Sequence, residues 1–213
     1  MALSDLFRRK KDDADPDAGA QPGVPALPTK ALGRLLATLA SREQPILIDL
    51  GPVVGSNVNF FGEQLGCKIF VEDVTKDIDR HVKEGKIDDL PAFFAQRFPQ
   101  ADNSVDGILC WDVFDFLDKK SAPSLAKQLT RILRPEGAML AFFNASEPVA
   151  GAKPTYTRHI VVDRQNLQHR QYPAARGKQR PWLNRDIQRM FEPLRIAEQF
   201  LLKTNMREVL FRK

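Results

Sequence analysis

The sequence predicts an α/β fold with a doubly wound, mostly parallel sheet that ends in an antiparallel C-terminal hairpin. Four short apolar runs are typical of strands buried on both faces of a sheet. They lie at residues 46–48, 67–71, 105–111 and 138–143. Helical segments separate these runs, and this alternation favours parallel strands joined by right-handed crossovers. The last two predicted strands, residues 195–202 and 207–212, are so closely connected that they must pair antiparallel.

Helical periodicity fills the segments between the strands. In residues 30–41, Leu32, Leu35, Leu36 and Leu39 fall on one face, which predicts a helix that packs on the sheet. Further helices are expected after residue 60, at residues 77–85 and 90–98, from Ser121 to before Pro135, and around residues 184–191. A β-hairpin is expected at residues 156–162 and 167–172.

Residues 1–28 are predicted to form a disordered N-terminal tail ahead of one domain, residues 29–213. The run FRRKKDDAD is highly charged, and four prolines interrupt a stretch of alanine, glycine and aspartate. Such a composition buries too little apolar surface to offset the entropy of ordering the chain. The alternative is that Leu3 and Leu6, beside the basic run, touch a membrane or a partner.

Composition narrows the class of protein. Cys67 and Cys110 show no CxxC spacing, so the sequence favours buried free thiols over a disulfide framework or a zinc site. No apolar run approaches a membrane span and the first residues lack the apolar core of a signal peptide, so a cytoplasmic protein is expected. Residues 151–213 hold 14 Lys and Arg against 5 Asp and Glu. We therefore expect a basic, substrate-side segment at about residues 151–183.

The stretch ILIDLGPVVGSN, residues 46–57, is the centre of the predicted site. A strand runs into a loop with Gly51 and Gly55, which allow backbone conformations and a close ligand approach that side chains forbid. Glu72 and Asp73 follow the next strand about 20 residues later, where an acid can accept hydrogen bonds from two ribose hydroxyls. An ordinary strand-to-helix turn and a solvated strand end are the alternatives.

Three segments between residues 32 and 143 resemble the class I S-adenosylmethionine-dependent methyltransferases. They are IDLGPVVGSN, IFVEDV, and VDGILCWDVFDFL followed by LTRILRPEGAMLAFF, whose Arg-hydrophobic-Leu-x-Pro-x-Gly turn is frequent before the fifth strand of that family. The resemblance implies a Rossmann-like fold and S-adenosyl-L-methionine as cofactor. It also implies a cofactor site made of Asp49, Gly51, Gly55, Asn57, Glu72, Asp73, Trp111 and Asp112.

The chain departs from the family pattern at two places. The family loop reads Asp/Glu-x-Gly-x-Gly-x-Gly, and Val53 replaces its middle glycine. This valine either narrows the space for the methionine part of the cofactor or points away from it, and we expect the second. The acid that meets the adenine amine in many relatives is replaced by Lys86 or Ile87, with only Asp88 and Asp89 nearby. No Asn/Asp-Pro-Pro-Tyr run is present, which argues against the common N-methylating enzymes of DNA and glutamine.

Methyl transfer does not require a nucleophilic side chain, because positioning supplies much of the acceleration. An oxygen or nitrogen acceptor can still need a base. Asp112, at the end of a predicted strand, and His159, in the predicted hairpin, are the catalytic candidates. Cofactor contact or helix capping is the alternative for Asp112, and a surface hairpin is the alternative for His159.

The sequence therefore predicts methyl transfer to an unidentified acceptor, either a small molecule or an acidic or phosphate-bearing one. Tyr156, Tyr172 and Trp182 among the arginines also allow binding to nucleic acid, although a solvated surface is the commoner explanation. The main alternative is a catalytically inactive, methyltransferase-like regulator or scaffold. An NAD(P) oxidoreductase is less favoured, because Val53 and Ser56 occupy glycine positions of its loop.

Overall fold

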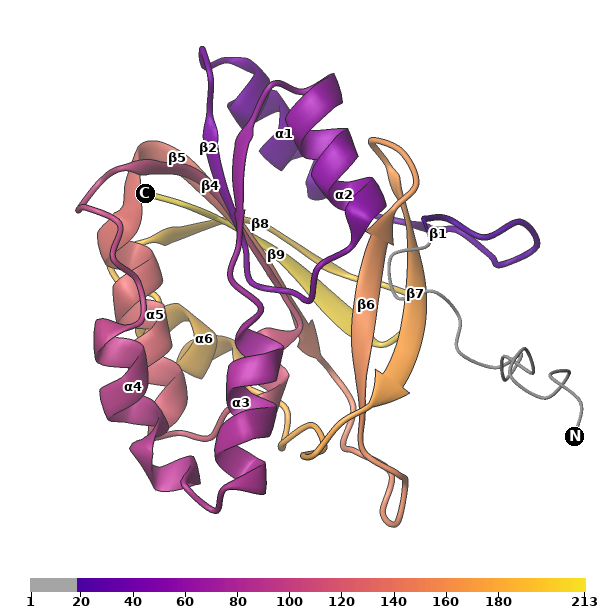
Figure 1. Ribbon diagram of the computed structural model, residues 1–213, viewed down its shortest axis with the longest axis vertical. Coiled ribbons are helices and arrows are strands. Elements are labelled where there is room, and N and C mark those ends of the chain that lie inside the picture. Colours follow the sequence, from indigo (N-terminus) through magenta and orange to yellow (C-terminus); the bar gives the residue numbers. More distant parts are fainter. Residues whose placement is uncertain (1–18) are drawn as a thin grey trace, which may run out of the picture.

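The main sheet of the protein is mostly parallel, as the sequence predicts. A computed structural model describes residues 19–213 and shows this sheet at the centre of the molecule (Figure 1). Its six strands have the order β3-β2-β4-β5-β9-β8. The parallel strands are β3 (Lys68–Val71), β2 (Ile46–Asp49), β4 (Val105–Trp111) and β5 (Leu133–Asn144). Strand β9 (Met206–Arg212) pairs antiparallel with β5 and with β8 (Arg195–Leu201), which confirms the Rossmann-like sheet and its C-terminal hairpin.

Alternate residues of the central strands contribute their side chains to two separate hydrophobic cores. Ile48 and Ile108 point into the larger core, whereas Leu47 and Leu109 point into the smaller one on the opposite face of the sheet. The larger core is covered by α3 (Val74–Lys83), α4 (Leu90–Gln96), α5 (Ser121–Ile132) and α6 (Asn184–Met190). The smaller core is covered by α1 (Leu32–Ala40), α2 (Gly55–Asn59) and a second sheet.

The second sheet has three strands in the order β1-β7-β6. Strands β6 (Thr155–Val161) and β7 (Asn166–Pro173) form the predicted hairpin, and β1 (Leu27–Pro28) pairs antiparallel with β7. Figure 1 shows the hairpin (orange) beside α2, on the side where the parallel strands end. The hairpin therefore covers the region in which the sequence places the functional site.

The predicted N-terminal tail is shorter than expected. Residues 1–18 lie outside the described residues, so that part of the prediction stays untested. Residues 19–28, which belong to the predicted tail, are hydrogen-bonded to the hairpin in the structure. Gln168 exchanges hydrogen bonds with the backbone of Gln21 at 2.8 and 3.0 Å and also donates to the Val24 carbonyl at 2.9 Å. The sequence pattern missed this segment because backbone hydrogen bonds, rather than an apolar face, hold it in place.

Two helices begin earlier than their apolar pattern suggests. Helix α3 was expected from residue 77 but begins at Val74, because the Asp73 carboxylate accepts a hydrogen bond from the Lys76 amide at 3.1 Å. Helix α2 begins at Gly55 and continues as one π-helical turn, Phe60–Gln64. Such π turns are frequent near functional sites, and this one buries Phe60 and Phe61 in the smaller core.

Both cysteines are buried free thiols, as predicted. Cys110 lies inside β4, and burial raises the pKa of its thiol well above the ordinary value. Cys67 lies one residue before β3, and burial raises the pKa of its thiol to about 11. Across residues 19–213, every helix is too short or too polar to cross a membrane.

Candidate functional site

The carboxyl ends of β2, β3 and β4 meet at one edge of the main sheet and bring the predicted site residues together. Asp49 ends β2 and is buried. Its Oδ1 accepts hydrogen bonds from the Gly51 amide at 2.9 Å and from the Trp111 indole N–H at 2.6 Å. Burial raises the pKa of Asp49 to about 6, even though both hydrogen bonds favour the carboxylate. Asp49 therefore holds the glycine loop against the end of β4.

The indole of Trp111 fills the space next to Gly51. A Cβ atom on residue 51 would lie 2.7 Å from Trp111 Cδ1, so only glycine fits here. The imidazole of His159 stacks on the indole, with ring centroids 5.0 Å apart and planes at 4°. Trp111 has a φ of +49°, a conformation that is rare for a bulky residue and that clusters at functional sites. Side chains of the protein thus occupy the space over the start of the glycine loop.

The rest of the glycine loop supports the hairpin. Val53 is 48% exposed, and the expectation that its side chain points away from the cofactor stays a prediction. Gly55 is the first residue of α2. Asn57 is buried, donates from Nδ2 to the His159 carbonyl at 2.8 Å and accepts at Oδ1 from the Val161 amide at 2.8 Å. Both ends of its carboxamide are therefore bound to β6 rather than directed at a ligand.

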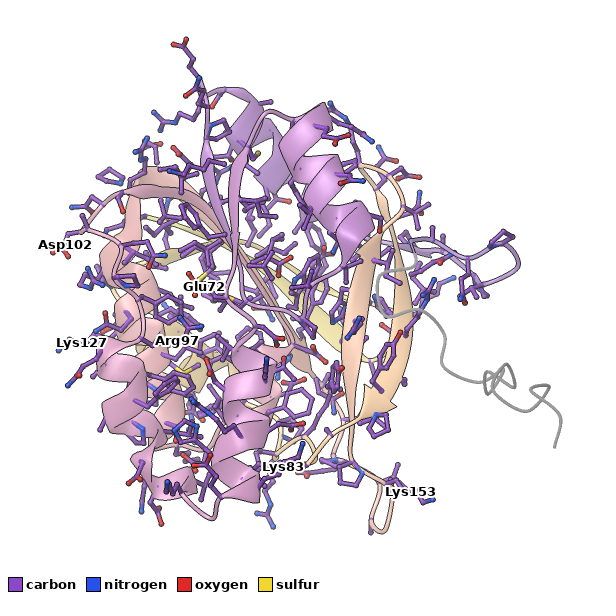
Figure 2. All side chains as sticks on the ribbon, viewed as in Figure 1. Glu72, Lys83, Arg97, Asp102, Lys127 and Lys153 are labelled. Carbon is purple, nitrogen blue, oxygen red and sulfur yellow. The ribbon has the colours of Figure 1, made fainter. Side chains whose placement is uncertain are left out.

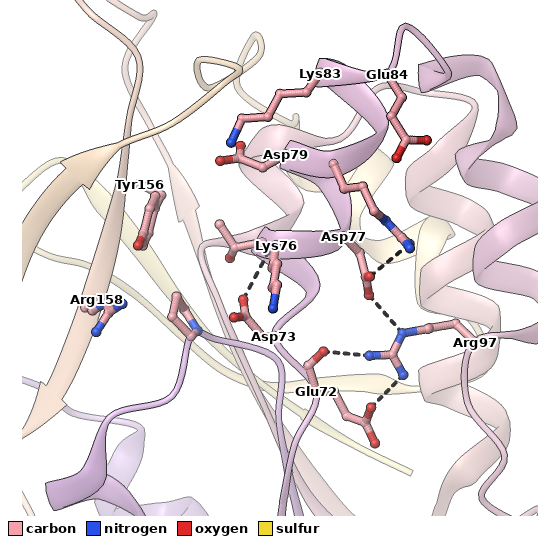
Figure 3. A pocket seen from close by; sticks show the side chains of 13 residues that line it. Glu72, Asp73, Lys76, Asp77, Asp79, Lys83, Glu84, Arg97, Tyr156 and Arg158 are labelled. Atoms are coloured by element: carbon pink, nitrogen blue, oxygen red, sulfur yellow. Dashed lines mark hydrogen bonds and ion pairs between the residues drawn. The ribbon is translucent and has the colours of Figure 1, made fainter. Parts of the chain in front are cut away.

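The two acids after β3 have different surroundings. Glu72 accepts hydrogen bonds from Arg97 Nη1 at 2.6 Å and from Gln100 at 3.1 Å. Figure 2 places Glu72 and Arg97 near each other in the middle of the molecule, and Figure 3 shows Arg97 between Glu72 and Asp77. Asp73 forms no salt bridge within residues 19–213 and lies at the start of α3, where burial raises the pKa of its carboxyl. Glu72 is thus held by Arg97, whereas Asp73 is available to a ligand.

A polar cavity of about 690 Å³ opens beside Asp73, between the glycine loop, α3 and β6. Figure 3 shows Tyr156 and Arg158 of β6 facing α3 across it. Five acidic and five basic side chains line the cavity: Glu72, Asp73, Asp77, Asp79, Glu84, Lys76, Arg80, Lys83, Arg97 and Arg158. Such a balance suits a ligand that carries charges of both signs. We call this space the Asp73 cavity.

The acids considered for adenine lie away from the Asp73 cavity. Ile87–Asp89 form a short 3₁₀ turn between α3 and α4. The Asp88 side chain is 88% exposed, and its carboxylate lies 3.9 Å from the Lys120 ammonium. Neither Asp88 nor Asp89 is among the described residues that line the cavity.

A buried ionic cluster follows the end of β4. Asp112 Oδ1 lies 3.1 Å from His159 Nε2, and Asp112 Oδ2 lies 2.7 Å from Lys178 Nζ. The same ammonium lies 3.1 Å from Asp115 Oδ2. Burial opposes ionisation of both acids, but Lys178 and His159 hold the pKa of Asp112 well below its usual range. For Asp115 burial prevails and raises the pKa to about 6. The two catalytic candidates, Asp112 and His159, are therefore direct neighbours.

Sequence reasoning missed Lys178 as a member of this cluster. It was grouped with the basic residues of the last third, but its ammonium is buried between two carboxylates, and these two acids raise its pKa. Arg176 of the same stretch lies 3.9 Å from Asp118. In the sequence, Asp112 and Asp115 follow a buried strand, which indicates that they need a cation as counter-charge. Nothing in the sequence indicates that this cation is Lys178.

Comparison with known proteins places this architecture in a family. Residues 48–141 match the family model of a methyltransferase domain. Over these residues the chain is similar to the class I S-adenosylmethionine-dependent methyltransferases. The CcbJ methyltransferase from Streptomyces caelestis has a similar fold, with a TM-score of 0.51 at 14% identity over 94% of this chain and 99% of that one. The PH0226 protein from Pyrococcus horikoshii OT3 has a TM-score of 0.50 at 14% identity over 85% and 87% of the two chains. No curated protein matches the sequence.

The match to a methyltransferase domain supports S-adenosylmethionine as the cofactor, and the site fits the two halves of that molecule differently. The Asp73 cavity has the size of a small-molecule site and an acid at the expected end of β3, so it fits the nucleoside half. Over the glycine loop, the Trp111 indole is packed against Gly51. The methionine half therefore fits only once this indole has moved aside.

Proposed function

We propose that the protein transfers a methyl group from S-adenosylmethionine to a small acceptor molecule, with the nucleoside half held in the Asp73 cavity. The observation that carries the proposal is the position of Asp73, which follows β3 at the edge where β2, β3 and β4 end. Its carboxylate can accept hydrogen bonds from ribose hydroxyls. When bound, the cofactor supplies an electrophilic methyl group on a sulfonium. The basic side chains Lys83 and Arg158 in the same cavity support an acidic or phosphate-bearing acceptor.

His159 is the residue that we propose as general base for an acceptor with an ionisable proton. Asp112 is held ionised by Lys178, so it accepts a hydrogen bond and assigns the proton of the imidazole to Nε2. The other nitrogen, Nδ1, then carries a lone pair, is buried, and has no hydrogen-bond partner among the described residues, so an acceptor reaches it only once the covering side chains have moved. This arrangement, a carboxylate that orients an imidazole, is the one that general bases use.

Trp111 is proposed to act as a gate for the cofactor. Its backbone strain, on the order of 1–3 kcal/mol, favours a second conformation in which the indole leaves Gly51. If Trp111 never leaves, the protein is instead an inactive, methyltransferase-like regulator. The contact between Gly51 and the indole is the observation that favours this second function.

Calorimetry with S-adenosylmethionine, S-adenosylhomocysteine and NAD tests the proposal. We expect the first two to bind and NAD to show no heat. Asp73→Asn should weaken binding about 10- to 100-fold, because it removes a charge-assisted contact of about 1.5–3 kcal/mol. Glu72→Gln is the matched control, since Glu72 is paired with Arg97, and it should leave the affinity within about threefold.

If Glu72→Gln weakened cofactor binding and Asp73→Asn did not, the assignment of Asp73 to the ribose would be overturned. Absence of binding in the wild type at millimolar cofactor, together with binding by Trp111→Ala, would support the regulatory function instead.

A further inference from the structure

A second cavity lies on the far side of the hairpin from the Asp73 cavity. It has a volume of about 410 Å³ and opens between β1, β7 and the turn that joins β8 to β9. Its walls are mainly apolar, with Phe142 of β5, Leu167 of β7 and Leu201 of β8 among them. This volume lies in the range of small-molecule sites, which are typically apolar with a few polar groups. We call it the Leu201 cavity.

The charge of the Leu201 cavity differs from that of the Asp73 cavity. Lys30 and Lys203 are the only charged side chains that line it within the described part of the chain, and the lining includes no acid. Neither lysine forms a salt bridge within residues 19–213. The Lys30 ammonium lies 5.1 Å from the centre of the Phe200 ring, and both residues also line a neighbouring hollow that contains Glu198. The cavity is therefore a mainly apolar space whose lining carries two lysines and no acid within the described part of the chain.

The buried acid Glu208 and the imidazole of His169 do not change the charge of the cavity lining. Glu208 is fully buried, and its carboxylate accepts hydrogen bonds from the Thr29 hydroxyl and, at 2.8 Å, from the Lys30 amide. It is thus held by β1 and the start of α1 and does not line the cavity. His169 lines the cavity, and burial lowers its pKa to about 3, so its imidazole is neutral at pH 7.

We infer that the Leu201 cavity binds a small amphipathic anion, whose hydrocarbon body packs against Phe142 and Leu167 and whose anionic group pairs with Lys30 and Lys203. Burial of the apolar body supplies most of the affinity, and the two ammonium groups select the sign of the charge. The inference goes beyond methyl transfer, because it requires neither the cofactor nor the Asp112 cluster. A carboxylate and a phosphate ester share the required chemistry, so the test includes both.

A series of ligands with similar alkyl chains and different charges tests this inference by calorimetry on the full chain. The probes are octanoate, octyl phosphate, octanol and octylammonium, which have nearly the same alkyl chain and differ in the head group. We expect saturable binding of at least one anion, with affinity about fivefold or more above that of octylammonium. Which anion binds more tightly distinguishes the carboxylate from the phosphate class.

Substitutions at Leu201 test the location. Its side chain is 69% exposed, so Leu201→Asp and Leu201→Lys are both expected to fold. The aspartate should weaken binding of the anion about fivefold, whereas the lysine should preserve or strengthen it. Lys83→Gln, in the Asp73 cavity, is the control and should leave the affinity unchanged.

Three results would overturn the inference: no saturable binding of either anion, equal affinity for octylammonium, or equal effects of the two Leu201 variants. None of these results bears on whether S-adenosylmethionine binds in the Asp73 cavity.

Discussion

Replacing Lys178 with methionine should strongly destabilise the protein, because it leaves two buried carboxylates without their shared counter-ion. The Asp112 and Asp115 side chains are only 5% and 2% exposed, and the ammonium lies 2.7 and 3.1 Å from them. Removing one partner of a buried ion pair costs about 3–5 kcal/mol. The Lys178 side chain is 22% exposed, so water offsets part of this loss and we expect about 3 kcal/mol at pH 7.

The pH dependence gives this prediction a second readout. Burial already raises the folded-state pKa of Asp115 to about 6, above the ordinary value of 3.8. Its contribution to stability is therefore present below pH 3.8 and lost as the pH rises through 6. Without the lysine this pKa rises further, so Asp115 stays protonated to higher pH. The gap in unfolding free energy between wild type and Lys178→Met should thus narrow from pH 8 to pH 5.

Urea denaturation of four proteins measures both effects: wild type, Lys178→Met, Asp115→Asn and the double variant. The double variant should recover about 1–2 kcal/mol relative to Lys178→Met, since one of the unpaired charges is gone. A loss below about 1 kcal/mol in Lys178→Met, or a gap that widens at pH 5, would show that the ammonium does not neutralise this pair.

Three further predictions concern other parts of the molecule. The folded-state pKa of His169 is about 3, so the wild type should lose stability as the pH falls below about 6.5. In His169→Phe, the loss of stability between pH 7 and pH 5 should therefore be about 2 kcal/mol smaller than in wild type. Equal pH profiles of the two proteins in urea denaturation would contradict this role of His169. Gln168→Ala should cost about 1–3 kcal/mol in urea, because it removes three hydrogen bonds to residues 21–24, while Gln171→Ala, with one bond to Thr157, should cost less. Val53→Gly should leave cofactor affinity unchanged by calorimetry and lower stability by about 0.5–1 kcal/mol; a gain in affinity would show that the valine enters the site.

The elements that local pattern determines could be predicted from the sequence. The strands before Asp49, Glu72 and Trp111 are short apolar runs between turns, and parallel pairing then brings their ends together. These strands are determined by residues close together in the sequence and do not depend on distant contacts.

The features that depend on distant partners could not be predicted. Glu72 is paired with Arg97, 25 residues further along the chain, and no local pattern shows this pairing. The indole of Trp111 reaches Asp49 across 62 residues, and no local pattern shows that it covers Gly51. Lys178 reads as one more surface cation until the fold places it between Asp112 and Asp115.

Asn57 also protects an open edge of the small sheet. In the order β1-β7-β6, no strand of residues 19–213 pairs with the outer side of β6, and such an edge can pair with another molecule. The carboxamide of Asn57 binds the carbonyl of residue 159 and the amide of residue 161, the two groups that a neighbouring peptide bond would use. The Asn57 side chain thus makes hydrogen bonds that a neighbouring strand would otherwise make. Asn57→Ala should therefore leave β6 open to pairing with another molecule, and self-association should rise with protein concentration.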